Sequence, residues 1–401
     1  MLTEIAIVGS GPAGLLASLT LSEAGVPHVL IDHQRFPRDK VCGDAFSGKA
    51  VEQLRKVSRL RTAEILREDV VYPVFSMLLV SPRGDAFRLV FRESEQAALN
   101  GFTAPRKDYD HVLFELATAA PETTLIEGTR ITGYERTPGG HWRLFSGEEA
   151  ILDTRLVMVA DGARSVFTRT VLKRRTAGTS IAVRAYYGGV TFPDRRSIEL
   201  HFLDDLAPGY FWIFPMSHHR ANVGVGLGTR HRKTASPPLR DFFMQKQQSL
   251  FAGRFRNAVP EGKPQGWPIP LHTRWWELAG DGYMVLGDAA ELVDPFTGEG
   301  IGNAMLSGRL AAETAIAAKG NYAQPHLTPY VTALRRHLES EFAVSRFLHR
   351  LAARPWWFSQ MLRRLSRSPY ARRRVSEMLL NVEARKDLIN PIFYLRALVG
   401  F

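Results

Sequence analysis

The chain is nearly free of cysteine. Cys42 is the single cysteine in 401 residues, so an intramolecular disulfide and a cysteine-based metal site are both excluded. The twelve histidines show no spacing typical of zinc ligands, and we expect no metal. No apolar run is long enough to span a bilayer, and the run from Ile5 to Val8 is too short for a signal peptide. These absences favour a cytoplasmic protein.

Acidic residues are too few to balance the basic ones, and the imbalance is local. Lys and Arg number 52 against 40 Asp and Glu, a formal net charge of +12. Residues 331–401 alone hold 14 basic and 5 acidic side chains. Such a stretch suggests nucleic acid, an anionic membrane surface or an acidic ligand, and a solvated helix face has the same pattern. We expect no nucleic acid partner; the alternatives left open are a solvated face and peripheral contact with the inner face of the membrane.

The N-terminal segment has the pattern of a strand, a glycine turn, a helix and a second strand. These are the strand 4–8, the turn Gly9-Ser10-Gly11-Pro12-Ala13-Gly14, the helix 15–24 and the strand 26–31, which ends at Asp32. Gly9 permits a tight turn, Gly11 lets the backbone approach a pyrophosphate, and Gly14 allows close packing of helix on strand. The helix start at Pro12 and Ala13 then faces the phosphates, and Asp32 accepts hydrogen bonds from an adenosine ribose. The pattern predicts a dinucleotide-binding unit without saying which dinucleotide.

The rest of the chain divides into a β-rich block and a helical end. With 45% hydrophobic residues the chain is apolar enough for two or three domains. We expect a hairpin of the strands 70–80 and 86–91, and one antiparallel sheet of the strands 181–190, 197–202, 209–214 and 221–227. From Pro329 onward the pattern is helical, with breaks at Pro355, Pro369 and Pro391.

These patterns predict an α/β fold with a discontinuous Rossmann-like domain. Its segments are 1–70, 103–175 and 270–325; an inserted antiparallel β-sheet substrate domain takes 71–102 and 176–269, and a helical C-terminal region takes 326–401.

Three glycine–acid turns each follow an apolar strand. They are Gly9 to Gly14, Asp161-Gly162 and Gly287-Asp288. In this repetition the sequence resembles FAD-dependent oxidoreductases of the glutathione-reductase fold, in the branch related to aromatic hydroxylases. The resemblance implies that the first turn holds the FAD pyrophosphate, that Asp161 braces the same region, and that Asp288 binds the ribitol.

Three further motifs resemble the geranylgeranyl reductase family. They are Pro37-Arg38-Asp39-Lys40-Val41-Cys42-Gly43; Tyr210-Phe211-Trp212-Ile213-Phe214-Pro215 with Gly224-Val225-Gly226; and the run from Gly287 to Ile301, with Ser307-Gly308 beyond it. The resemblance covers residues 5 to about 312. It implies FAD as cofactor, with NAD(P)H or another donor visiting transiently, because no second glycine-rich unit is present for a nicotinamide nucleotide.

The resemblance also implies roles for individual residues. Lys40, Cys42 and Gly43 lie beside the flavin, Arg106 at a helix start helps to hold it, and a helix end in the loop formed by Pro295, Gly298, Gly300 and Ile301 points at the anionic edge of reduced flavin. Cys42, Tyr210 and Trp212 form the catalytic slot. We expect Tyr210, Trp212 and Phe214 on one face of the sheet and the glycines of Gly224-Val225-Gly226 on the other.

The implied activity is reduction of carbon–carbon double bonds in a polyprenyl chain or a related long apolar substrate, by hydride transfer from reduced flavin. The alternative within enzymes is an FAD monooxygenase or halogenase acting on an aromatic substrate, although halogenases of this fold have a WxWxIP motif that Tyr210 to Pro215 does not match. A catalytically silent flavin-binding adaptor is the third alternative. For the basic region we expect Trp357, Met361 and Leu365 on one helix face, with Arg363-Arg364, Arg367 and Arg372-Arg373-Arg374 around the rest.

Overall fold

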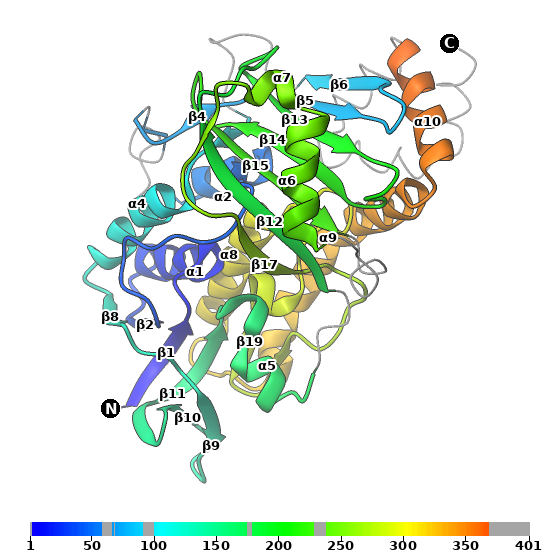
Figure 1. Cartoon of the computed structure of the whole chain (residues 1–401). Helices are drawn as coiled ribbons and strands as arrows, with labels where there is room; N and C mark the ends of the chain where they lie inside the picture. Colours follow the sequence, from blue (N-terminus) through cyan, green and yellow to red (C-terminus); the bar gives the residue numbers. More distant parts are fainter. Residues whose placement is uncertain are drawn as a thin grey trace.

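The computed structural model describes residues 2–57, 66–67, 69–90, 100–174, 179–227 and 238–368. Two eight-stranded sheets dominate it, one in the lower half and one in the upper half of Figure 1. The C-terminal helices run from the lower sheet toward the upper one (Figure 1). The chain is therefore an α/β protein with a helical C-terminal region, as the sequence predicts.

The lower sheet carries the glycine turns. Its order is β18-β19-β11-β1-β2-β8, with β10 and β9 paired onward from β11. The strands β19, β11, β1, β2 and β8 are parallel, so the carboxyl ends of β1, β11 and β19 meet at one edge. The bounds are β1 Leu2–Val8, β2 His28–Asp32, β8 Thr123–Glu127, β9 Gly133–Arg136, β10 Trp142–Ser146, β11 Glu149–Val159, β18 Ala279–Gly280 and β19 Tyr283–Val285.

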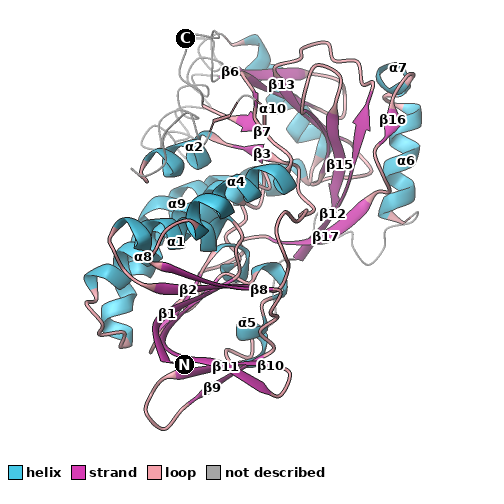
Figure 2. Cartoon of the chain, turned by 90° about the vertical axis from the view of Figure 1, so that its left-hand side faces the viewer, coloured by secondary structure: helices cyan, strands magenta, loops and turns pink. Residues whose placement is uncertain are grey.

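Helices α1 (Pro12–Glu23) and α8 (Ile301–Ala317) pack tightly against each other on this sheet. A Cβ atom at Gly308 would lie 2.0 Å from the carbonyl oxygen of Ala13, so only glycine allows the two backbones to come this close. Figure 2 shows α1, α8, α9 (Gln324–Ala352) and α4 (Arg106–Thr118) on one side of β1, β2 and β8. The short elements nearby are α2 Gly48–Arg55, η1 Gly162–Arg164, α5 Val166–Thr170 and η2 Gly287–Ala290.

The upper sheet has the order β16-β12-β15-β14-β13-β5-β6, and β17 pairs with β12. Its strands are β5 Ser76–Val80, β6 Ala86–Val90, β12 Thr179–Gly188, β13 Ser197–Phe202, β14 Tyr210–Pro215, β15 Ala221–Leu227, β16 Val259–Pro260 and β17 Gln265–Pro270. A small sheet, β3 (Ala45–Phe46), β7 (Phe102–Thr103) and β4 (Tyr72–Pro73), lies between the two large sheets in sequence and space.

The expectation of a wholly antiparallel upper sheet needs a correction. The β5–β6 hairpin joins the same sheet, and β5 runs parallel to β13. The hairpin comes from much earlier in the chain, so no tight turn links it to β13, and only strands joined by tight turns must be antiparallel. One face of this sheet packs against α6 (Leu239–Ser249) and α7 (Ala252–Phe255), and the other faces the C-terminal helices.

The C-terminal helices differ from the prediction in two details. Helix α9 begins at Gln324, before the expected start at Pro329, because Pro325 in the first turn loses no hydrogen bond there. The predicted break at Pro355 is confirmed, since α10 begins there (Pro355–Arg367), whereas Pro369, Pro391 and Arg372 to Arg374 lie outside the described residues.

The predicted helix face of Trp357, Met361 and Leu365 is divided between solvent and core in α10. Trp357 is 56% exposed, whereas Phe358, Leu362 and Leu365 are buried against the upper sheet. The ring centroid of Phe358 lies 4.6 Å from that of Phe202 in β13. Residues 358, 362 and 365 form the buried stripe at helical spacing, which shares Leu365 with the predicted face.

Candidate active site

A cavity of about 1150 Å³ runs between the two sheets. At one end it is lined by the turns that follow the strands of the lower sheet, including Gly11, Asp161 and Asp288. At the other end it reaches the face of the upper sheet, where Trp212 and Phe214 lie, and continues to α10. The cavity thus connects the three glycine–acid turns to a long apolar compartment.

The three glycine–acid turns are brought together at this edge. Gly9 donates a backbone hydrogen bond to Ile31 in β2, and Ala160 donates one to Val8 in β1. The two carboxylate oxygens of Asp32 accept the backbone N–H groups of Ser10 and Gln34, at 2.7 and 2.8 Å. Asp32 therefore ties the end of β2 to the first turn, and it still lines the cavity.

Gly11 leaves room for a ligand. No atom lies within 4 Å of a Cβ atom built there, so a side chain would project into the cavity at the start of α1. At Asp161, the Oδ2 atom accepts the N–H of Val166, whereas Oδ1 is buried without a hydrogen-bond partner in the described part of the chain. Burial raises the pKa of Asp161 to about 6. Open backbone at a helix start fits a phosphate-bearing cofactor, because the free N–H groups there can donate to phosphate oxygens.

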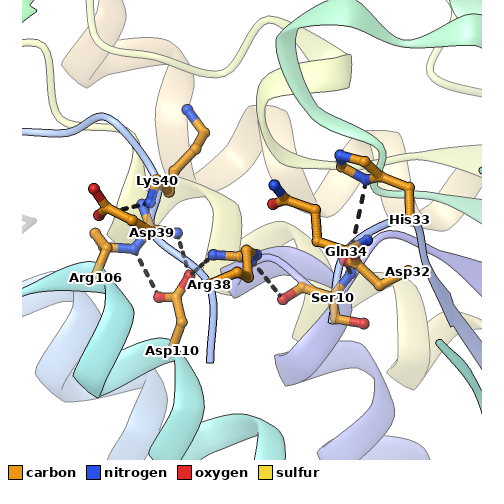
Figure 3. Close-up of polar contacts among 9 residues, drawn as sticks. All are labelled: Ser10, Asp32, His33, Gln34, Arg38, Asp39, Lys40, Arg106 and Asp110. Carbon is orange, nitrogen blue, oxygen red and sulfur yellow. Dashed lines mark hydrogen bonds and ion pairs between the residues drawn. The ribbon is translucent and has the colours of Figure 1, made fainter. Parts of the chain in front are cut away.

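Arg106 and Arg38 share one carboxylate (Figure 3). Arg106 binds both oxygens of Asp110, at 2.7 and 2.6 Å, and Arg38 binds Asp110 at 2.7 Å. Arg38 also donates to the carbonyl of Ser10 at 3.0 Å. The two guanidinium groups hold the pKa of Asp110 below its usual range despite burial. The cluster fixes the first glycine turn against α4, and Arg106 also lines the cavity.

Lys40 points away from Arg106 and Asp110 (Figure 3) and lies over the ring of Trp267, with its Nζ atom 4.7 Å from the ring centroid. Arg164 lies over the same ring, at 4.6 Å. Burial lowers the pKa of Lys40, and the carboxylate of Asp288 opposes that shift. Lys40 and Asp288 therefore face the same part of the cavity from different elements.

The loop before α8 is held from within and from the upper sheet. Asp294 Oδ1 accepts the backbone N–H groups of Phe296 and Thr297 at 2.9 and 2.8 Å. The Tyr210 hydroxyl donates to the Thr297 carbonyl at 2.5 Å. A Cβ atom at Gly298 would lie 2.8 Å from the Tyr210 oxygen. Tyr210 therefore positions this loop, which the sequence reasoning did not anticipate.

The loop leads directly into a helix that opens on the cavity. Gly300 is the N-cap of α8 and Ile301 its first residue, while Pro295 precedes them in the buried part of the loop. Asp288, Gly298, Gly300 and Ile301 all line the cavity, and Gly287 precedes Asp288 with a φ of 56°.

Asn222 connects three parts of the predicted slot. Its side-chain oxygen accepts the Nε1 hydrogen of Trp212 at 2.9 Å. Its Nδ2 group donates to the Cys42 carbonyl at 2.8 Å and to the Asp44 carboxylate at 2.9 Å. Cys42 and Trp212 are thus brought together, and Asn222 is the residue that joins them.

The expectation that aromatics and glycines occupy opposite faces is wrong. Trp212 pairs directly with Gly224, and Tyr210 with Gly226, and paired residues of antiparallel strands share a face. A Cβ atom at Gly224 would lie 2.2 Å from the Trp212 ring. The glycines make room for the indole rather than opening the other side. Gly43 packs on the same aromatics, because a Cβ there would lie 3.0 Å from Phe214.

Three polar residues of this region escaped the sequence reasoning. Asp44, Tyr186 and Asn222 lie on a loop and on two strands, and the Tyr186 hydroxyl donates a short hydrogen bond to Asp44. The signal for Asp44 was its place directly after Cys42 and Gly43. Tyr186 and Asn222 carry no local signal, because only the pairing of β12 with β15 brings them together.

Beyond Trp212 the cavity becomes an apolar arm, which we define as the part between the upper sheet and α9–α10. Aliphatic and phenylalanine side chains dominate it, and they come from β5, β6, β13, the loop before α8, α9 and α10. The members are Met77, Leu79, Phe87, Leu89, Ile198, Leu200, Phe296, Leu348, Phe358, Met361, Leu362 and Leu365.

This geometry defines a flavoprotein oxidoreductase. Residues 2–337 match a protein family described as "FAD binding domain". The turns, the open backbone at Gly11 and the loop before α8 fit FAD along the polar end of the cavity. The chain is an FAD-dependent oxidoreductase and belongs to the geranylgeranyl reductase family.

The relatives support this assignment. The chain is 30% identical to digeranylgeranylglycerophospholipid reductase of Methanoculleus marisnigri, over 82% of this chain and 80% of that protein. It is 28% identical to menaquinone reductase of Mycolicibacterium smegmatis, over 88% and 85%.

Solved structures share the fold. A geranylgeranyl bacteriochlorophyll reductase-like protein from Thermoplasma acidophilum superposes with a TM-score of 0.81 at 19% identity, covering 99% of this chain and 98% of that one. A flavin-dependent brominase superposes with a TM-score of 0.75 at 19% identity, covering 98% and 99%. Fold likeness alone therefore does not choose between reductase and halogenase.

Metal-binding clusters and membrane-spanning helices are both absent from the described residues. They contain no group of three or more His, Cys, Asp or Glu side chains arranged to hold a metal ion. Among the helices of the same residues, none combines the length and apolarity needed to cross a bilayer.

Proposed function

We propose that the protein reduces carbon–carbon double bonds of an isoprenoid chain carried by a lipid or a quinone. The apolar arm carries this proposal, because it continues the flavin cavity along β13, β5 and β6 of the upper sheet and presents aliphatic side chains on both walls. The two curated relatives are a lipid reductase and a quinone reductase by name, and both names fit a long apolar substrate.

Within this function each predicted residue has a role. Bound FAD, once reduced, supplies the hydride. Trp212 and Phe214 form the apolar wall where the arm meets the flavin end, and Cys42 lies at that junction. The N-terminus of α8 presents its positive dipole end to the reduced flavin, which favours the anionic form.

The aromatic monooxygenase or halogenase is the weaker candidate. A small aromatic substrate would leave the arm between α10 and the upper sheet unfilled, and Tyr210 to Pro215 departs from the halogenase motif. The intact cradle at Gly11 and the loop before α8 also argue against a silent adaptor.

The electron donor is proposed to be NAD(P)H or a similar reduced nucleotide that binds transiently. The sequence has one glycine-rich dinucleotide unit, and FAD takes it.

The protein is also proposed to work on the cytoplasmic face of the membrane. Trp356 and Trp357 are 50% and 56% exposed, and their rings contact each other edge to face at 4.7 Å. They lie in the first turn of α10, and Phe358, which directly follows them, lines the apolar arm. Together with Arg363, Arg364 and Arg367 they offer a surface for anionic lipid next to the arm.

The decisive experiment is anaerobic. The FAD of the purified holoenzyme is reduced with dithionite, and reoxidation is followed after adding a polyprenyl phospholipid, a prenylated quinone or a phenol. We expect reoxidation by an isoprenoid substrate, with two added hydrogens in the product by mass spectrometry. Reoxidation that requires oxygen and a phenol would replace this proposal with a monooxygenase.

A further inference from the structure

A fully buried carboxyl group lies beside the junction of the two cavity ends, and the roles above do not use it. Asp44 has no exposed surface and a backbone φ of 62°, which ordinary residues rarely adopt. Its Oδ2 atom accepts hydrogen bonds from the Tyr186 hydroxyl and from Asn222 Nδ2. Its Oδ1 atom has no hydrogen-bond partner in the described part of the chain. A buried carboxyl group with one oxygen lacking a hydrogen bond, on a residue with a left-handed backbone, lowers the stability of the fold. Such residues concentrate at functional sites.

Charged and titratable groups face Asp44 from each element around it. Strand β12 brings Tyr186 and Arg184, α4 brings Arg106, and its own loop brings Cys42. Burial raises the pKa of Asp44 to about 7, and the Tyr186 hydrogen bond and the Arg184 charge oppose that shift. The carboxyl group therefore gains and loses its proton near physiological pH.

Asp44 is coupled to the Cys42 thiol. Burial raises the pKa of Cys42 above its usual value, the nearby Arg106 lowers it, and the Asp44 carboxylate raises it further. The backbone N–H of Asp44 donates to the sulfur and favours the thiolate. Cys42 and Asp44 both line the cavity, and Asp44 has no exposed surface. The Cys42 thiolate therefore binds a proton more tightly than the Asp44 carboxylate does.

We propose that Asp44 is a positioning residue that stores a proton and reloads Cys42 during reduction of a carbon–carbon double bond. The inference rests on the proposed function. In that reaction a hydride, with its electron pair, passes from the reduced flavin to one alkene carbon, and the flavin is oxidised. The Cys42 S–H bond breaks and its proton goes to the other carbon, leaving a thiolate. The Asp44 O–H proton then passes to the sulfur, and the remaining carboxylate, bonded to Tyr186 and Asn222, regains a proton from water that enters the cavity before the next turnover.

The first test needs no substrate. Because Cys42 is the single cysteine, alkylation of the oxidised holoenzyme by iodoacetamide reports on that thiol alone. Above pH 7 the Asp44 carboxylate suppresses the thiolate, so Asp44→Asn should raise the alkylation rate at pH 8 about tenfold, the equivalent of one pKa unit. The surface variant Asp205→Asn, on the far side of the upper sheet, should match the wild type. Identical profiles for Asp44→Asn and the wild type would overturn the inference whatever the substrate.

The second test follows steady-state turnover of the isoprenoid substrate against pH, because only repeated turnover requires Cys42 to be reloaded. The wild-type rate should fall as pH rises through about 7, whereas Asp44→Asn should be about 100-fold slower at pH 6 and insensitive to pH. Tyr186→Phe removes a hydrogen bond that favours the carboxylate, so its falling limb should move to higher pH, and this variant decides the matter if Asp44→Asn fails to bind FAD.

The outcomes separate the two proposals. A wild type that reduces the double bond, with unshifted profiles in both variants, refutes the relay and leaves the proposed function intact. A wild type that reduces no isoprenoid double bond refutes the proposed function, and the relay with it.

Discussion

At the scale of single residues, glycines that leave space for the cofactor differ from glycines that are needed for packing. Gly11 and Gly308 both lie in the contact region of α1 and α8, yet a side chain would meet different surroundings at each. At Gly11 it would enter open cavity, and at Gly308 it would strike the Ala13 carbonyl. Glycine is therefore needed at position 11 to leave space for a ligand, and at position 308 to let the two helices pack.

Substituting Gly11 tests the cofactor cradle. Gly11→Val should abolish FAD binding, because the new side chain fills the space where the backbone must approach the pyrophosphate. The apoprotein should keep its thermal midpoint. Gly308→Ala is the matched control and should lower the midpoint of the apoprotein itself. FAD absorbance of purified protein and thermal unfolding measure both effects; a yellow Gly11→Val protein would contradict the assignment.

His272 makes stability depend on acid. It is 1% exposed, its ring centroid lies 4.2 Å from that of Phe342, and burial lowers its pKa to about 4. Between pH 6.5 and 4 the unfolded chain binds a proton at this residue and the folded protein does not, so stability falls as pH falls. At pH 5 the loss from this residue is about 2 kcal/mol.

His272→Phe should remove that loss. Urea unfolding of variant and wild type at pH 7 and pH 5 is the measurement, and the variant should lose about 2 kcal/mol less between the two. His141→Phe, at an exposed turn, is the control and should behave as the wild type. Equal losses for His272→Phe and the wild type would show that the buried ring accepts a proton in the folded state.

At the scale of elements, α10 forms one wall of the apolar arm. Phe358, Leu362 and Leu365 face β5, β6 and β13 across it. Helix α10 also contacts β6 directly, so the arm is closed on the side of the hairpin. Chain length of the substrate should therefore be set by residues of this helix.

Filling the arm should discriminate by substrate length. Leu362→Trp places a bulky ring in it and should raise KM for a long polyprenyl substrate at least about tenfold, a loss of about 1.4 kcal/mol in binding. Short prenyl substrates and the rate of flavin reduction by the donor should be unchanged. Arg363→Trp, on the exposed side of α10, is the control. A uniform loss for short and long substrates would mean that the arm does not hold the chain.

The elements that the sequence predicts well are those with local causes. The turns at Gly9, Asp161 and Gly287 are required by backbone conformation, and each follows a short apolar strand, so sequence alone locates them. The face that α10 buries is not local, because apolar residues occupy two adjacent stripes and only the upper sheet selects the one with Phe358. The link from Asn222 to Cys42 and Asp44 likewise depends on strand register across 180 residues, which no short pattern encodes.

At the scale of the whole molecule, the exposed tryptophans lie where the apolar arm meets solvent-facing helix. Trp356 and Trp357 contribute little to the core, since half or more of each side chain is exposed. Tryptophan favours the interface between lipid and water, and nearby arginines favour anionic headgroups.

Membrane contact can be measured directly. The double variant Trp356→Ala/Trp357→Ala should sediment with anionic liposomes at least about tenfold less than the wild type, which should itself require anionic lipid and weaken with salt. FAD content and the reduction of detergent-solubilised substrate should be unaffected, because neither ring lines the cavity. If the wild-type protein stays in the supernatant at low salt, the tryptophans and arginines do not bind a membrane, and the basic surface is only solvated.

The long helix α9 connects the cofactor end and the substrate end of the molecule, and we expect it to couple the binding of the two ligands. It is unbroken over 29 residues, about 44 Å; Leu327, Tyr330 and Leu334 anchor its first half in the flavin domain, and Leu348 and Ala352 in its last turns pack at the apolar arm. A substrate chain that enters the arm therefore contacts a helix whose first half is packed in the flavin-binding part of the protein. If FAD changes the dissociation constant of the substrate by some factor, the substrate must change the dissociation constant of FAD by the same factor. Calorimetric titrations in both orders should return this common factor, and we expect it to differ from one.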